Sequence, residues 1–385
     1  MSNSITKLEI YLTQLGGRNP VFVKLHTQDG ITGMGEAGIA YGVGSVSVCA
    51  MIQELGEKYL LGRSPWDVEA FFSKIHDLAF WSKGGGAIIY SAVSALELAM
   101  WDLQGKTLQL PVYQLAGGKV REKIRVYANG WTLDANTPDE YAVRAKNAVE
   151  DGHIALKMYP FTTPVGDKKL NQFSIPELRT VDRAFEKLAV QRVRAVREAI
   201  GDEIELMIDM SSLLTPDAVI HFARQVEDSN ILWLEEPAEP QNLSGLQQIN
   251  QHCSIPLATG ERLFTRYGMK DTLLSGAISF IQPDLGNCGG MMEARKIASF
   301  AEPFGLRVAL HNCASPYLTA VSSHLAACIP NFYILECFNY LIPEHYQVVD
   351  HAPEMMVENG FINLNDKPGF GITLDDDWLS TFLWK

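Results

Sequence analysis

The sequence predicts an α/β protein in which a (β/α)8-type barrel follows an N-terminal α+β domain. Three observations support this prediction. Strand patterns come first and helical patterns follow them. Beyond residue 122, short apolar runs alternate with helix-sized segments, and polar residues end these runs at regular intervals. The length of 385 residues also fits two domains, since one domain usually spans about 100–200 residues.

The N-terminal part has the pattern of an α+β unit. Residues 5–15 alternate between apolar and polar, and residues 21–37 make two strand-like runs around Asp29-Gly30, which is a strong hairpin signal. Helical patterns follow, and we assign the whole unit to residues 1–121. The expected helices span residues 45–61, 65–79 and 86–106.

The barrel is predicted over residues 122–350. Continuous apolar runs are typical of parallel strands that are buried on both faces, and eight of them with helical segments between them indicate a closed barrel. An open doubly wound sheet is the rival, but no G-x-G-x-x-G follows the first run. The eight runs are 124–130, 153–159, 204–209, 231–236, 255–261, 278–284, 306–312 and 332–338.

Two further segments carry expectations. Residues 351–385 have the pattern of strand, turn and strand, and we expect this tail to return to the first domain. The polar loop 160–178 follows the second barrel strand. It either covers a site at that end of the barrel or is a solvated excursion.

Composition excludes several classes of partner. The net charge is −13 and no run of five basic residues occurs, so we expect neither nucleic acid nor a membrane surface as a partner. The six cysteines form no C-x-x-C pair, which argues against a zinc ribbon or a thioredoxin-type site. The start of the chain lacks a signal-peptide pattern, and no apolar stretch is long enough to span a membrane, so we expect a cytoplasmic protein.

Polar residues near the ends of seven consecutive barrel strands form the strongest signal. From the third strand to the eighth they follow one another at intervals of 23 to 27 residues, which is about one β-α unit. Equal phase in each unit places these side chains around the C-terminal mouth, where barrel enzymes keep their active sites. The residues are Lys157, Asp209, Glu235, Glu261, Asp284, His311 and Glu336.

Three of these residues suggest a metal site. Asp209, Glu235 and Glu261 would converge from neighbouring strands, and three uncompensated carboxylates repel one another. Mg²⁺ prefers such oxygen ligands and leaves positions for water and substrate. The alternative is a set of ion pairs with Lys157, Arg262 and other cations.

The remaining strand ends suggest acid–base chemistry. Asp284 beside His311 would fix the imidazole tautomer and raise its basicity, which makes a general base, whereas the alternative is a structural histidine. Glu336 would face the metal across the mouth, where a protonated carboxyl group could donate to a developing oxyanion. The alternative for Glu336 is a core glutamate paired with a lysine or arginine.

At this point the sequence resembles the enolase superfamily, in its mandelate racemase branch. The resemblance covers nearly the whole chain and implies a modified (β/α)7β barrel, capped by a domain built from the N-terminus and the C-terminal tail. It implies that Asp209, Glu235 and Glu261 hold one Mg²⁺, that Asp284 and His311 are the catalytic dyad, and that Glu336 donates to the intermediate. The matching motifs are GMGEA (33–37), MWDLQGK (100–106), VYQLAGG (112–118), WLEEP (233–237), ATGER (258–262), QPD (282–284), LHN (310–312) and KPGFG (367–371).

Two departures from the branch bear on function. Its racemases carry K-x-K after the second strand, and here Lys157 is followed by Met158 and Tyr159, so a second base is missing unless Tyr159 serves. The galactonate dehydratase type has D-x-H on the third strand, where this chain has Ser211 in the histidine's place. The resemblance makes Lys157 the partner of the substrate carboxylate, and we expect Tyr159 and Ser211 to contact substrate as well.

A single histidine base most resembles the sugar-acid dehydratases. We therefore expect a dehydratase that converts an aldonic or aldaric acid to its 2-keto-3-deoxy acid through an enediolate. A racemase or epimerase, a lactone cycloisomerase and a non-catalytic metal-binding regulatory protein remain alternatives. We expect a homo-oligomer whose small-molecule partner is an acid sugar.

The resemblance also implies that capping-domain loops choose the substrate. The candidates are residues 37–45 and 80–88. Within the second, Gly84-Gly85-Gly86 could offer backbone N–H groups to an anion, but a tight turn is the favoured interpretation.

Overall fold

The computed structural model describes residues 3–15, 17–39, 41–161, 163–164, 173–174 and 183–385. The polar loop 160–178 lies mostly outside these residues, so its expected role as a cover is a prediction that they do not test. Its described parts include the short strands β6 (Thr163–Pro164) and β7 (Phe173–Ser174), which pair antiparallel.

The N-terminal strands form an antiparallel sheet in the order β1-β2-β3, as predicted. The strands are β1 (Ile5–Leu12), β2 (Val21–Thr27) and β3 (Thr32–Ala37), with the expected turn at Gly30, whose φ is +84°. Gly35 on β3 lets the next long helix approach closely, because a Cβ there would lie 2.0 Å from the carbonyl oxygen of Ala95.

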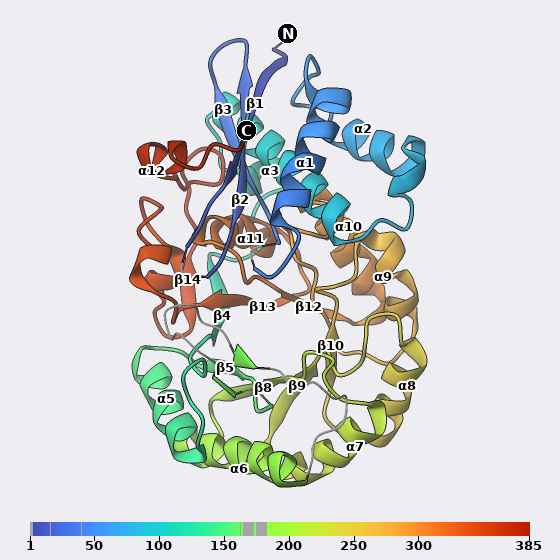
Figure 1. Cartoon of the computed structure of the whole chain (residues 1–385), viewed down its shortest axis with the longest axis vertical. Helices are drawn as coiled ribbons and strands as arrows, with labels where there is room; N and C mark the ends of the chain where they lie inside the picture. The colour runs from blue at the N-terminus through green and yellow to red at the C-terminus, as the bar shows by residue number, and fades with distance from the viewer. Residues whose placement is uncertain (1–2, 16, 40, 162, 165–172, 175–182) are drawn as a thin grey trace.

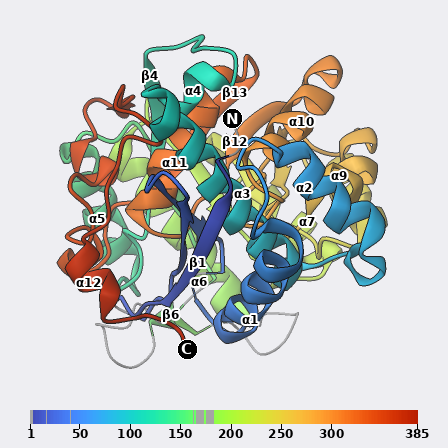
Figure 2. The ribbon, with the colours of Figure 1, turned by 90° about the horizontal axis from the view of Figure 1, so that it is seen from above.

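The three predicted helices of this domain are present. They are α1 (Ser45–Leu55), α2 (Val68–Ser73) and α3 (Ala87–Leu108), and a π-helical turn extends each of the first two, at Gly56–Leu60 and Lys74–Leu78. A single turn of helix, α4 (Val112–Leu115), then leads into the barrel. Figures 1 and 2 show this unit as a cap at one side of the barrel.

The eight apolar runs all become parallel strands of one barrel. The ring closes because β13 pairs with β4, with Leu335 opposite Val126. In chain order the strands are β4 (Lys123–Asn129), β5 (Ala155–Met158), β8 (Glu205–Asp209), β9 (Ile231–Glu235), β10 (Leu257–Thr259), β11 (Phe280–Ile281), β12 (Arg307–Leu310) and β13 (Phe332–Phe338).

In the described part of the chain, seven helices connect these eight strands, which is the (β/α)7β arrangement that the resemblance implied. The helices lie on the outside of the ring (Figure 1). They are α5 (Pro138–Glu150), α6 (Arg183–Ile200), α7 (Pro216–Gln225), α8 (Leu243–His252), α9 (Thr265–Leu274), α10 (Met291–Ala301) and α11 (Pro316–Cys328).

A layer of side chains fills the barrel interior. Each strand contributes one buried residue, and large rings alternate in part with alanines: Tyr127, Ala155, Met207, Trp233, Ala258, Phe280, Ala309 and Ile334. The Trp233 ring lies 5.8 Å from Tyr127 and 4.7 Å from Phe280, measured between ring centroids. This layer fills the barrel below its C-terminal mouth. The space above the layer, at the C-terminal ends of the strands, is called the basin.

The C-terminal tail differs from the predicted strand, turn and strand. Its first strand, β14 (Phe361–Asn363), pairs antiparallel with β4 of the barrel. In place of a second strand the tail forms the short helix α12 (Asp376–Ser380), because the Asp375 side chain accepts a hydrogen bond from the backbone N–H of Trp378 and caps it. The end of the tail does reach the capping domain, where Trp384 N donates to the carbonyl oxygen of Ile10 at 2.8 Å.

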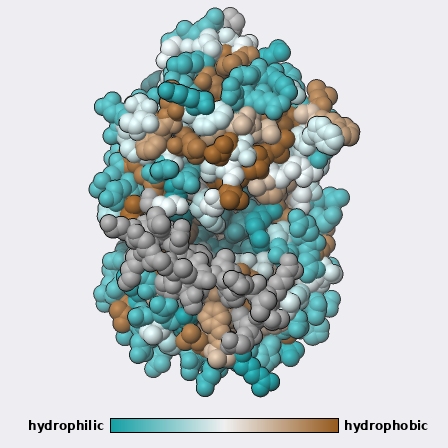
Figure 3. All heavy atoms as spheres, in the orientation of Figure 1, coloured by the Kyte–Doolittle hydropathy of each residue, from teal (hydrophilic) through white to brown (hydrophobic). Residues whose placement is uncertain are grey.

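The space-filling surface is hollowed where the capping domain meets the barrel below it (Figure 3). Among the described residues, no helix has the length and apolar character needed to cross a bilayer.

Candidate active site

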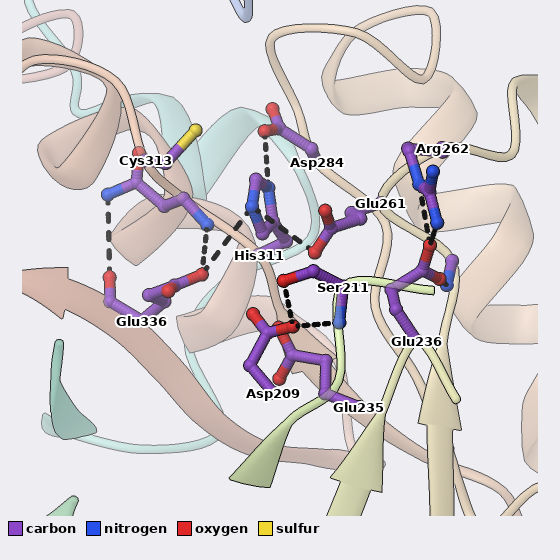
Figure 4. A network of polar contacts seen from close by, with 12 residues as sticks. Asp209, Ser211, Glu235, Glu236, Glu261, Arg262, Asp284, His311, Cys313 and Glu336 are labelled. Atoms are coloured by element: carbon purple, nitrogen blue, oxygen red, sulfur yellow. Dashed lines mark hydrogen bonds and ion pairs between the residues drawn. The ribbon is translucent and has the colours of Figure 1, made fainter. Parts of the chain in front are cut away.

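The structure brings the seven predicted strand-end residues together at the C-terminal mouth of the barrel. Figure 4 labels all of them except Lys157 and shows their side chains gathered around one region. Lys157 lies on β5, Asp209 ends β8, Glu235 ends β9, Glu261 follows β10, Asp284 follows β11, His311 follows β12 and Glu336 lies on β13.

Three carboxylates make the group that fits a metal. Asp209, Glu235 and Glu261 each place an oxygen within 4.8 Å of the others, and Asp209 stands directly opposite Glu235 in the β8–β9 pairing. Burial raises the pKa of Glu235 to about 7 and that of Glu261 well above its ordinary value. A buried set of hard oxygen donors that resists carrying its charge alone is what a divalent cation such as Mg²⁺ stabilises.

Lys157 lies against the same carboxylates. Its Nζ contacts Glu235, and it lies 3.4 Å from Asp209 Oδ2 and 2.8 Å from Glu336 Oε1. Ion pairs with Lys157, one of the alternatives for this cluster, are therefore present. The other cation considered, Arg262, pairs instead with Glu236, at 2.6 Å. Among the described residues, Lys157 is the one ammonium group that pairs with these carboxylates, and its single charge leaves them with an excess of negative charge, so the donor set still fits a cation.

The Asp284–His311 pair has the geometry of an oriented base. Nδ1 of His311 lies 2.7 Å from Asp284 Oδ2, and the backbone N–H of Gly286 donates to the other Asp284 oxygen at 2.7 Å. Nε2 of His311 lies 3.5 Å from Glu261 and 3.7 Å from Glu336, so it faces the carboxylate basin. Burial alone would lower the pKa of His311, but Glu261, Cys313 and Glu336 outweigh it and raise the pKa well above the ordinary value.

Glu336 lies between Lys157 and His311 and contacts residues from both neighbouring strands. One of its oxygens accepts hydrogen bonds from Asn129 and Lys157, and the other accepts from the backbone N–H of Asn312 at 3.1 Å. Burial would raise the pKa of Glu336, but Lys157 and His311 outweigh burial and hold the pKa below its usual value. These contacts favour the carboxylate, whereas the sequence suggested a protonated donor. Glu336 is also paired with a lysine, as the alternative held.

Tyr159 and Ser211, the other two predicted contact residues, lie at the edge of this basin. The Tyr159 hydroxyl accepts a hydrogen bond from Asn129 Nδ2 at 2.7 Å, and burial raises its pKa well above 10. Ser211 donates from its hydroxyl and its backbone N–H to Asp209 Oδ1, at 2.9 and 2.8 Å. Its contacts therefore orient a metal-ligand candidate, and its positive φ of 46° belongs to that tight turn.

Two site residues were missed in the sequence. Asn129 ends the first barrel strand, at the same position in its β-α unit as the charged strand-end residues, so the regular spacing could have identified it. Its side-chain amide donates hydrogen bonds to Tyr159 and Glu336. Cys313 lies two residues after His311, and the ligand atoms of Asp284, His311 and Cys313 fall within 4.8 Å of one another. No sequence pattern distinguishes that cysteine from a core residue.

Comparison with known proteins agrees with this geometry. Residues 4–117 match the family model of the mandelate racemase / muconate lactonizing enzyme N-terminal domain, and residues 140–378 match the enolase C-terminal domain-like model. The chain is 32% identical over 378 residues to a D-xylonate dehydratase of Haloferax volcanii, covering 96% of this chain and 87% of that protein. It is 31% identical over 365 residues to a D-gluconate/D-galactonate dehydratase of Picrophilus torridus, covering 94% and 88%.

Solved structures give the same result. A protein from Mesorhizobium loti, described provisionally as a dehydratase, superposes with a TM-score of 0.95 at 40% identity over 99% of both chains. A member of the enolase superfamily from Salmonella Typhimurium superposes with a TM-score of 0.92 at 32% identity over 98% of both chains. The barrel with its capping domain, the acidic group at its mouth and these matches together show that the chain belongs to the mandelate racemase / muconate lactonizing enzyme family of the enolase superfamily.

Proposed function

We propose that this protein is a Mg²⁺-dependent dehydratase that converts a sugar acid to its 2-keto-3-deoxy acid. The observation that carries the proposal is the combination of a single oriented imidazole, His311, with the carboxylate group Asp209, Glu235 and Glu261 in one basin. Relatives that act on xylonate, gluconate and galactonate support the reaction class.

Elimination rather than racemisation follows from the protonation of the other groups in the basin. A racemase needs a base on each face of the α-carbon. Lys157 is held protonated, because Glu235 and Glu336 outweigh burial and raise its pKa well above 10.5. The raised pKa of Tyr159 keeps its phenol protonated as well. The carboxylates of Glu261 and Glu336 also raise the pKa of His311, and a cation held by Glu261 would offset part of that charge. Among the described residues of the basin, we therefore assign the role of base to His311, because Asp284 orients it and its Nε2 faces the carboxylates.

The chain's own residues divide the chemistry as follows. Lys157 pairs with the substrate carboxylate, and Asp284 holds His311 so that Nε2 faces the α-carbon. His311 Nε2 takes the α-proton, and the electron pair of the C–H bond moves into the carboxylate as an enediolate. A divalent cation held by Asp209, Glu235 and Glu261 would supply positive charge that offsets this negative charge.

The second half of the reaction expels water. The enediolate electrons return to form a C2–C3 double bond as the C3–O bond breaks, and the His311 imidazolium gives its proton to the departing hydroxyl. The resulting enol then tautomerises to the 2-keto-3-deoxy acid. One histidine serves in both steps, which requires the α-proton and the β-hydroxyl to lie on the same side of the substrate.

A screen of sugar acids tests this assignment. We expect the purified protein with Mg²⁺ to form a 2-keto acid from at least one member of a library of aldonic and aldaric acids. The product in D₂O should contain no C2 epimer of the substrate. Epimer formation without a 2-keto acid would replace the dehydratase by an epimerase, and no C2 exchange with any acid would contradict the proposal.

A further inference from the structure

We propose that Arg18 binds a second carboxylate at the far end of the substrate, so that the preferred substrate is an aldaric diacid. This inference rests on the proposed function and deepens it. Arg18 belongs to the turn between β1 and β2, where Leu15 and Arg18 exchange backbone hydrogen bonds of 2.8 and 2.9 Å. No feature of the sequence pointed to it.

Contacts place the Arg18 guanidinium at the mouth of the barrel. Nη1 donates to the carbonyl oxygen of Cys313, two residues beyond His311. The guanidinium also stacks on the Phe338 ring, at 4.4 Å from its centroid. Phe338 lies two residues beyond Glu336 on β13, which is roughly 7 Å nearer the mouth. That step is comparable with the length of a short sugar chain, so Arg18 lies where the far end of a substrate would lie.

The charge of Arg18 is the reason to expect an anion there. Its side chain is buried (9% exposed), yet among the described residues no carboxylate forms an ion pair with it. A buried charge without a counter-ion is costly, and a guanidinium offers five N–H donors in a fork that matches a carboxylate. A diacid would supply the missing partner.

A buried arginine with a structural role, Arg197, differs from Arg18 in how many of its donors are already hydrogen-bonded. Arg197 donates to four backbone carbonyl oxygens, those of Gly201, Ile204, Ser229 and Asn230. Arg18 has one such acceptor in the described part of the chain. Most of its donors therefore remain available to a ligand.

A second capping-domain residue, Tyr41, lies beside Arg18. The Tyr41 ring, which is 56% exposed, lies 5.4 Å from the Arg18 guanidinium. Tyr41 belongs to the segment 37–45, which is anchored where Gly38 N donates to the carbonyl oxygen of Gly286, at 2.7 Å, just after Asp284. Arg18 and Tyr41 thus form one wall of the basin on the side of His311.

The test compares sugar acids that differ only at the far end. D-gluconate with D-glucarate and D-galactonate with galactarate exchange a hydroxymethyl group for a carboxylate. We expect the wild type to have the higher kcat/KM for the diacid of a pair that it accepts. Arg18→Met should lower that diacid-to-monoacid ratio by roughly 30-fold or more, the scale of a lost buried charge pair. Arg18→Lys keeps the positive charge but loses the forked guanidinium donors, so its diacid-to-monoacid ratio should lie between those of the wild type and Arg18→Met.

Arg121→Met is the matched control. Arg121 also stacks on a phenylalanine, Phe332, at 5.1 Å and donates to backbone carbonyls, but it precedes β4 at the opposite end of the strands. The Arg121→Met substitution should therefore leave the diacid-to-monoacid ratio at the wild-type value. If Arg18→Met lowers kcat/KM equally for both acids, Arg18 is a structural clamp and the inference is wrong.

Failure of the proposed function is a separate outcome. If no acid of either kind yields a 2-keto acid, calorimetry with glucarate, galactarate and the two monoacids in Mg²⁺ decides about Arg18 alone. Diacid binding by the wild type that weakens in Arg18→Met supports the anion site without the reaction. Equal binding of mono- and diacids by both proteins overturns it.

Discussion

At the scale of single residues, Lys157 and the metal-ligand candidates compete for the same negative charge. The Lys157 ammonium lies against Glu235 and 3.4 Å from Asp209, where it offsets part of the charge that a cation would otherwise meet. The two kinds of side chain should therefore affect metal affinity in opposite directions.

Calorimetric titration with Mg²⁺ measures this competition. Glu235→Gln removes one ligand charge and should weaken binding by more than the roughly 10–100-fold that loss of an outer partner costs. Lys157→Met removes the competing ammonium and should bind Mg²⁺ at least as tightly as the wild type, although substrate turnover is lost. If Lys157→Met weakens Mg²⁺ binding as much as Glu235→Gln does, the assignment of the ligands is wrong.

Single residues also show which parts of the site could not be predicted from the sequence. The charged strand ends were found because each falls in the same phase of a β-α unit. Asn129 obeys the same phase but is neutral, and Arg18 contacts Cys313 across 295 residues of sequence, so no local pattern could reveal that contact. The contacts of Glu336 with the amide of Asn129 and the ammonium of Lys157, which favour its carboxylate form, come from other strands and leave no local pattern in the sequence.

At the scale of elements, one contact joins the capping domain to α11, the helix that follows β12. Glu36 on β3 accepts hydrogen bonds from the hydroxyl and backbone N–H of Ser315, at 2.6 and 3.0 Å, and Ser315 caps the N-terminus of α11. Burial raises the pKa of Glu36 to about 8. The folded protein therefore holds a proton on Glu36 that the unfolded chain releases at its ordinary pKa of 4.5.

The sign of the pH effect follows from this proton. Glu36 contributes stability that is fully present below pH 4.5 and is lost as the pH rises to about 8. Glu36→Gln keeps the shape of the protonated form, so it should be about as stable as the wild type at pH 5 and more stable at pH 9. The gap is up to a few kcal/mol, at about 1.4 kcal/mol per pKa unit.

Urea unfolding at the two pH values measures that gap. Glu54→Gln, which changes an exposed glutamate paired with Lys58, is the control and should follow the wild type at both pH values. A Glu36→Gln variant that is less stable than the wild type at pH 9 would show that the ionised carboxylate is the stabilising form.

At the scale of the whole molecule, the repeat of strand and helix made the barrel predictable. Eight buried runs with helical segments between them leave few other arrangements, and all eight became strands of one closed ring. The tail was predicted less well. A strand pattern alone does not tell which sheet it joins, and β14 joins β4 rather than the N-terminal sheet. The acidic cap of α12 was taken for part of a strand because its few residues carry too short a pattern to show helical period.

We propose that a single base, His311, acts at the mouth of the barrel. Exchange of the substrate α-proton with D₂O, followed by NMR, tests it most directly. With an acid that the wild type dehydrates, His311→Asn should show neither exchange nor 2-keto acid. Asp284→Asn should keep slow exchange, because it loosens His311 without removing it. Exchange by His311→Asn at a rate comparable with the wild type would contradict the account and identify another base, with Tyr159 beside Lys157 the first to examine.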